Sequence, residues 1–218
     1  MFVQNYMTPS PVTIQPDLLV TEALELLTKY TFRHLPVVDA EKQLLGMLTD
    51  RDLRSACPSS ILNSEERQQV LDRVKGKLVS AIMSKDFISL RVVSTLDDAL
   101  MLFETRSIGA LPVVDDQKRV VGILSLNDMM AAYRNLFGLG EKGSFLLAIK
   151  DTGDPKALSS LVGVMEKNNI VFTRFIRTDG SDHEPAMIYL RINTYNMRSV
   201  HRAVEDAGFT VLIPGVND

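Results

Sequence analysis

The sequence predicts a mixed protein of the α+β / α/β class, in which two tandem βαββα repeats are followed by a βαββαβ unit. Residues 3–53 align with residues 79–129 at a constant offset of 76, without a gap. Both copies carry one stripe of apolar residues at the i, i+3, i+4, i+7 spacing of a helix face. Its members are Val20, Ala23, Leu24, Leu27, Leu96, Ala99, Leu100 and Phe103. Because one repeat cannot bury such a face alone, the copies are expected to pack on each other.

The first copy begins with alternating apolar residues, Val12 and Ile14, which predict a short strand. A helix follows over the apolar stripe, with Asp17 as its expected N-cap. Two strands at Leu35–Val38 and Gln43–Leu48 and a helix at Asp50–Ala56 complete this copy.

The second copy gives the same order of elements. Strands are predicted at 88–90, 111–114 and 120–124, and helices at 96–106 and 126–135. Ser94 and Asp97 have the spacing of a capping box at the first of these helices.

An insert at Pro58–Leu78 separates the copies. Within it, Glu66–Lys77 predicts a mostly polar helix with a narrow apolar stripe, Val70, Leu71 and Val74. We interpret it as a surface or partner-facing appendage.

The third unit follows the glycine-spaced segment Gly138–Gly143. That segment has the spacing of a dinucleotide fingerprint, but it lies between a helix and a strand, which is the opposite of the required order, so it is interpreted as a linker. Strands at 145–149, 170–176, 187–192 and 209–213 alternate with two helices, one after Asp154-Pro155 and one at Asn196–Ala207. The order βαββαβ is that of a ferredoxin-like unit. The predicted domains are therefore 1–57, 58–78, 79–137, 138–143 and 144–218.

Bulk composition excludes several classes of function. Of 218 residues, 45% are hydrophobic and 23% charged, with a net charge of −3, which is typical of a globular protein without a nucleic-acid footprint. Apolar runs are far shorter than the roughly 20 residues that span a bilayer. The lone Cys57 and the absence of a signal peptide at the N-terminus favour a cytoplasmic protein with no membrane partner.

The repeats resemble CBS motifs, which form a Bateman module when paired. The resemblance rests on MTPSPVTI, HLPVVD and GMLTDRD in the first copy, and on MSKDFISL, ALPVVD and GILSLND in the second. The third unit resembles an ACT domain, a regulatory fold of amino-acid metabolism, although its turn Asp151–Pro155 departs from the usual form. The whole order is similar to the bacterial acetoin-utilisation protein B family.

Each copy carries the motif Gly-x-x-[Ser/Thr]-x-x-Asp, which in CBS modules resembles a nucleoside site. Its members are Gly46, Thr49, Asp52, Gly122, Ser125 and Asp128. A carboxylate accepts hydrogen bonds from both ribose hydroxyls, and a helix start favours phosphate. Adenine is expected against strand edges that include Val12, Ile14, Ile88 and Leu90. The same spacing also makes Thr49–Asp52 and Ser125–Asp128 capping boxes that require no ligand.

The copies differ just before the LPVVD strand, where the resemblance places phosphate contacts. Arg33-His34 stands there in the first copy and Gly109-Ala110 in the second. A phosphorylated adenosine should therefore prefer the neighbourhood of Arg33 and His34, and a less charged ligand could suit the second copy. A solvated Arg and a surface His are the alternative.

No catalytic constellation or zinc pattern stands out, because the histidines are scattered and no nucleophile has a partner at useful spacing. We therefore expect a non-catalytic regulatory protein, without a metal, that binds an adenosine-containing ligand such as AMP, ADP, ATP, NAD or S-adenosylmethionine. A homodimer is expected, and a partner enzyme is a further candidate. The alternatives are a constitutive dimeric scaffold, an amino-acid sensor acting through the ACT-like unit, and an enzyme of acetoin metabolism.

Overall fold

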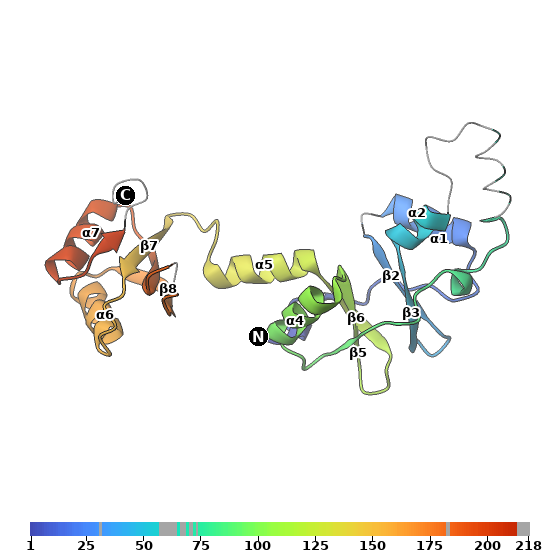
Figure 1. The fold of residues 1–218 in the computed structure, drawn as a ribbon, viewed down its shortest axis with the longest axis horizontal. Helices are drawn as coiled ribbons and strands as arrows, with labels where there is room; N and C mark the ends of the chain where they lie inside the picture. Colours follow the sequence, from blue (N-terminus) through green and yellow to red (C-terminus); the bar gives the residue numbers. More distant parts are fainter. Residues whose placement is uncertain are drawn as a thin grey trace. The chain divides into compact units, whose positions relative to one another are not determined.

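The computed structural model describes residues 1–30, 32–56, 65, 69, 72, 74–181 and 184–212 (Figure 1). The chain divides into two compact units, Met1–Ala131 and Ala132–Asp218. The division falls inside helix α5 (Leu126–Phe137), so this helix contributes to both units. Each unit is described by itself.

The first unit contains both repeats, and their elements follow the predicted order. The first copy consists of η1 (Val3–Asn5), β1 (Thr8–Pro9), α1 (Val20–Lys29), β2 (His34–Val38), β3 (Leu44–Thr49) and α2 (Asp50–Ala56). The second consists of η2 (Val79–Ala81), β4 (Leu90–Arg91), α4 (Leu96–Arg106), β5 (Ala110–Val114), β6 (Val120–Ser125) and the first turns of α5.

Each repeat contributes one antiparallel hairpin with equivalent register. Pro36 faces Met47 in β2–β3, and Pro112 faces Ile123 in β5–β6. The hairpin loops also bond each other, since Leu44 donates to the carbonyl of Lys118 and Val120 to that of Lys42. The two copies are therefore joined through their hairpins. The first-copy stripe, by contrast, is buried mainly within its own repeat, against Leu35, Val37 and Leu48, and not on the stripe of the second copy.

The segment that opens each copy crosses to the hairpin of the other copy. β1 pairs with β6, with Thr8 opposite Ile123, and Ser84 forms the equivalent bridge with Met47 of β3. The glycines of the repeated motif permit this approach. A β-carbon at Gly46 would lie 2.7 Å from the carbonyl oxygen of Ser84, and one at Gly122 would lie 2.2 Å from the sulfur of Met7.

The next segment of each copy returns to its own hairpin. Ile14 bridges Val37 in parallel, and β4 pairs with β5 in parallel. The predicted strand at Val12–Ile14 is thus reduced to one bridge at Ile14, and the strand predicted at 88–90 lies at Leu90–Arg91 instead.

Two predicted helix caps are wrong by one or two residues. Helix α1 has Leu19 rather than Asp17 as its N-cap, and the Glu22 carboxylate accepts from the Leu19 amide at 3.1 Å. Helix α4 is capped by Thr95 with Asp98, not by Ser94 with Asp97. In both helices the first and last members of the predicted stripe are buried, whereas Leu100 is exposed.

The predicted insert helix lies mostly outside the described residues, as do Cys57, Val70 and Leu71. Val74 is described, and it is buried with the first-copy core rather than exposed. That position therefore packs against the repeat, which differs from a purely surface appendage.

The second unit shows the predicted βαββαβ order. After the last turn of α5 it contains β7 (Ser144–Lys150), α6 (Ala157–Lys167), β8 (Val171–Thr178), β9 (Met187–Asn193), α7 (Met197–Asp206) and β10 (Val211–Leu212). All neighbouring strands of the sheet are antiparallel, in the order β10-β7-β9-β8. The predicted strand end at Ile213 lies outside the described residues.

The core of this unit lies between one sheet face and its two helices (Figure 1). The predicted alternation in β9 is confirmed, because Ile188, Leu190 and Ile192 are all fully buried. Helix α6 begins later than predicted. Asp154 and Pro155 form the turn before it, in which Asp154 accepts from the Lys156 amide at 2.8 Å.

No helix in the described part of the chain is long and apolar enough to cross a membrane. Within the same residues, no group of three or more His, Cys, Asp or Glu side chains is arranged to hold a metal ion.

Candidate functional site

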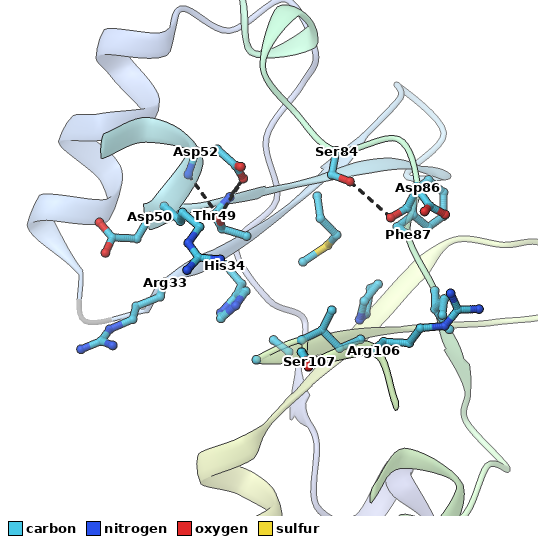
Figure 2. A pocket seen from close by; sticks show the side chains of 17 residues that line it. Arg33, His34, Thr49, Asp50, Asp52, Ser84, Asp86, Phe87, Arg106 and Ser107 are labelled. Atoms are coloured by element: carbon cyan, nitrogen blue, oxygen red, sulfur yellow. Dashed lines mark hydrogen bonds between the residues drawn. The ribbon is translucent and has the colours of Figure 1, made fainter. Parts of the chain in front are cut away.

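Two cavities lie between the repeats, and each combines residues of both copies. Cavity one, of about 670 Å³, brings Thr49 and Asp52 of the first copy together with Ile88, Arg106 and Ser107 of the second. Figure 2 shows Thr49 and Asp52 facing Arg106 and Ser107 across it. Its volume is typical of a small-molecule site.

Cavity two, of about 760 Å³, is the counterpart built from equivalent positions. It combines Ser125 and Asp128 of the second copy with Val12, Phe32 and Thr8 of the first. The crossing of the opening segments explains this composition, because Val12 follows β1 on the second-copy hairpin and Ile88 follows the Ser84 bridge on the first-copy hairpin. The motif residues of each copy therefore share a cavity with the opening segment of the other copy.

The cavities share a wall. Four residues line both of them: Arg33, His34, Gly109 and Ala110. The His34 ring packs on Gly109, where an added β-carbon would meet the imidazole Cε1 and Nε2 at 3.0 Å. Arg33 and His34 thus belong to neither cavity alone.

Both motif carboxylates form capping boxes, as the alternative interpretation predicts. Asp52 Oδ2 accepts from the Thr49 amide at 2.8 Å and from its hydroxyl at 2.7 Å. Asp128 Oδ2 accepts from the Ser125 amide at 2.8 Å and from its hydroxyl at 2.6 Å. Among the described residues, no donor reaches Oδ1 of either carboxylate. One oxygen therefore stabilises the helix start, and the other accepts no hydrogen bond from a described residue.

The two cavities differ in the number of their charged side chains, although the formal charges balance in each. Cavity one is lined by three arginines, Arg33, Arg51 and Arg106, and by three aspartates, Asp50, Asp52 and Asp86. None of these arginines forms an ion pair with a described residue. In cavity two the position equivalent to Arg51 is Asn127, and only Arg33 supplies a guanidinium.

The lining of cavity two is otherwise largely apolar. Its apolar members are Pro11, Val12, Phe32, Ile123 and Leu126. Leu126 stands where cavity one has Asp50, so the second motif replaces an acidic side chain with an aliphatic one.

The shared wall carries one titratable group that is held neutral. Burial lowers the pKa of His34 below its ordinary value of 6.5, and the positive charge of Arg33 lowers it further. The carboxylates of Asp52 and Asp50 act in the opposite direction. The net lowering leaves the imidazole uncharged at neutral pH, so it is a hydrogen-bonding group rather than a second cation.

Two predicted site residues do not line either cavity. The side chains of Ile14 and Leu90 are 5% and 3% exposed, and both segments are committed to their own hairpins. Gly46 and Gly122 of the motif do not line a cavity either, and the other predicted residues line one cavity or both. Sequence reasoning missed Arg106 and Phe32. Arg106 is the last residue of α4, and Phe32 lies between α1 and β2.

The family of the chain follows from comparison with known proteins. The CBS domain model matches residues 3–59 and 79–135, just over half of the chain. The protein therefore belongs to the CBS domain family, as a tandem CBS pair. Inosine-5'-monophosphate dehydrogenase of Aquifex aeolicus (strain VF5) is 35% identical over 128 residues, which is 58% of this chain but only 23% of that enzyme.

Solved CBS pairs show the same fold. CBSX2 in complex with AMP is 29% identical, with a TM-score of 0.53 over 62% of this chain and 98% of that one. A candidate acetoin utilization protein (AcuB) from Vibrio cholerae is 28% identical, with a TM-score of 0.53 over 64% of this chain and 94% of that one.

Proposed function

We propose that this protein is a non-catalytic regulator whose CBS pair binds adenosine-containing ligands in cavities one and two. The observation that carries the proposal is that Asp52 and Asp128 each accept hydrogen bonds with only one carboxylate oxygen. In each cavity the motif Asp orders a helix start with Oδ2 while Oδ1 remains available. The AMP complex of CBSX2 supports the choice of ligand class.

The proposed pose follows from the lining of each cavity. The ribose hydroxyls donate to Asp52 in cavity one or to Asp128 in cavity two, as charge-assisted hydrogen bonds. The adenine ring lies on the apolar segment that crosses from the other copy, at Ile88 or at Val12. The ligand therefore touches both copies.

The different number of arginines is the basis for proposing different ligands in the two cavities. Cavity one, with three unpaired guanidinium groups, suits a phosphorylated adenosine such as AMP, ADP or ATP, because arginine binds phosphate with a planar fork of donors. Cavity two, with its apolar lining, suits an adenosine that carries no phosphate.

A thermal-shift panel of adenosine, AMP and ATP tests this function on the full chain. A ligand at 100 times its Kd stabilises the folded state by about 2.7 kcal/mol, so the melting temperature should rise with adenosine and rise further with AMP. If no member of the panel shifts the transition, the proposed function is wrong and the chain is a constitutive scaffold.

For the second unit we propose an ACT-like, ferredoxin-like role in assembly or partner contact rather than amino-acid sensing. The turn after β7 is internally satisfied: Asp151 accepts from the Gly153 amide at 2.9 Å and forms an ion pair with Arg177. Both oxygens of Asp151 thus already have a partner within the unit. A homodimer is part of the proposal, since both kinds of unit commonly assemble through pairing, and light scattering tests it. A thermal shift by a free amino acid would favour the sensor alternative.

A further inference from the structure

Helix α5 is held at its two ends by different groups. At its start, the Ser125–Asp128 box orders the first turn beside cavity two. At its end, the side chain of Arg174, in β8, bonds the last carbonyls of the helix. Nε donates to the carbonyl of Leu136 and Nη2 to that of Asn135, both at 2.9 Å.

The same guanidinium is fixed from its other side. Arg174 Nη1 donates to Glu141 Oε2 at 2.8 Å, and Nη2 lies 2.8 Å from Glu141 Oε1. Nη1 also donates to the Thr173 hydroxyl at 3.0 Å. Gly138 makes room for this arrangement, because a β-carbon there would lie 2.6 Å from Nη1. The guanidinium of Arg174, in β8, therefore links the end of α5 to Glu141 in the turn that follows.

Apolar packing contributes little to the end of the helix. Met129 and Ala132 are buried, but all four residues from Arg134 to Phe137 are exposed. A helix of 12 residues is marginal on its own, and the last carbonyls of any helix lack intrahelical donors. Two backbone bonds close this end, from the Leu139 amide to the Arg134 carbonyl at 2.9 Å and from the Gly138 amide to the Asn135 carbonyl at 3.2 Å. Arg174 adds side-chain bonds to the carbonyls of Asn135 and Leu136.

We propose that Arg174 is a positioning residue that ties the last turn of α5 to β8, and thereby couples occupancy at Asp128 to the sheet of the second unit. Helix formation is cooperative, so a ligand that stabilises the first turn also stabilises the turns after it. The last turn is then a better partner for Arg174. The coupling rests on the proposed adenosine site, whereas the anchoring of the helix end does not.

Hydrogen exchange of the full chain, with and without saturating adenosine, tests both parts. In Arg174→Gln without ligand, amides in 133–139 should exchange roughly tenfold faster, which corresponds to the loss of one charged hydrogen bond. Arg174→Lys should not restore protection, because an ammonium group lacks the fork that bridges two carbonyls and Glu141. Arg177→Gln is the matched control, since Arg177 lies on the same strand but pairs with Asp151.

The coupling has its own readout. In the wild type, adenosine should slow exchange in 171–178, and Arg174→Gln should abolish that effect. By linkage, the same variant should weaken adenosine binding by roughly fivefold, at the lower end of typical coupling factors, while Arg177→Gln should not.

Failures of the two proposals are distinguishable. If adenosine binds wild type and Arg174→Gln equally and leaves 171–178 unchanged, the coupling is wrong although the binding site stands. If adenosine does not bind the wild type, the proposed function and the coupling fall together. Unchanged exchange in 133–139 of ligand-free Arg174→Gln would overturn the anchoring role.

Discussion

The imidazole of His34 lies so close to Gly109 that a β-carbon at position 109 would be 3.0 Å from both Cε1 and Nε2. Gly109 occupies the position equivalent to Arg33 in the second copy, and both residues of the contact line both cavities. At this point the two cavities are therefore separated by the His34 ring and the backbone of Gly109.

Gly109→Ala should displace the His34 ring and change ligand binding in both cavities at once. We expect adenosine affinity to fall in calorimetry and the His34 ring signals to shift in NMR spectra. Gly163→Ala is the matched control, since Gly163 lies in α6 with nothing within 4 Å of an added β-carbon. That control should leave binding unchanged and stabilise the fold by about 0.5–1 kcal/mol. Identical behaviour of the two variants would show that the contact has no part in binding.

Asp52→Ala and Asp128→Ala should each weaken one cavity by about 1.5–3 kcal/mol, because each removes a charged hydrogen bond to ribose. Each also removes a helix cap, so stability should fall as well. Asp98→Ala separates the two effects. Asp98 caps α4 through Thr95 in the same way but lines neither cavity. If all three variants lose stability and none loses adenosine affinity, the motif acids are caps and nothing more.

Arg106→Ala should reduce the preference of cavity one for AMP over adenosine, roughly three- to tenfold at low salt, since an exposed guanidinium is screened by ions. Replacing Arg33-His34 by Gly-Ala should reduce the same preference. The control is Arg91→Ala, because Arg91 is exposed and paired with Asp116 outside the cavities. If the ratio of AMP affinity to adenosine affinity is unchanged in both cavity variants, the phosphate does not bind near these arginines.

Stability should fall as the pH is lowered below 6.5, and His34 should account for part of the fall. Burial, assisted by the charge of Arg33, holds its folded-state pKa below its ordinary value of 6.5. Above pH 6.5 the ring is neutral in both states. As the pH falls from 6.5 through the folded-state pKa, the unfolded chain takes up the proton first, so the free energy of unfolding decreases. Urea titrations at several pH values should show a smaller decrease for His34→Gln. Parallel curves for the two proteins would argue against a buried neutral ring.

The elements of the repeats could be predicted because the same pattern of residues occurs in both copies. The bounds of α2 and α4 agree with those expected, and both hairpins lie at the predicted LPVVD strands. The helix caps were harder to place, because Ser94, Thr95, Asp97 and Asp98 offer two overlapping boxes that differ by one residue. The structure shows that the Thr95–Asp98 box forms, because the backbone is extended at Thr95 and helical from Leu96 on.

The composition of the cavities could not be predicted from local pattern. It depends on Thr8 pairing with Ile123 and Ser84 with Met47, which are contacts between distant segments. Alternation also failed to separate Val12 from Ile14, since both were expected on one face of a strand. Ile14 alone is bonded to the hairpin and buried, whereas Val12 is 41% exposed and lines cavity two.

The role of the two motif carboxylates is tested most directly by counting the adenosine molecules bound per chain, with native mass spectrometry of the full-length protein. We expect up to two per chain in the wild type, one in Asp52→Ala, one in Asp128→Ala and none when both are replaced. Asp98→Ala should keep both. A wild type that binds no adenosine, or a double variant that still binds two, would contradict the claim that these two carboxylates define the binding sites.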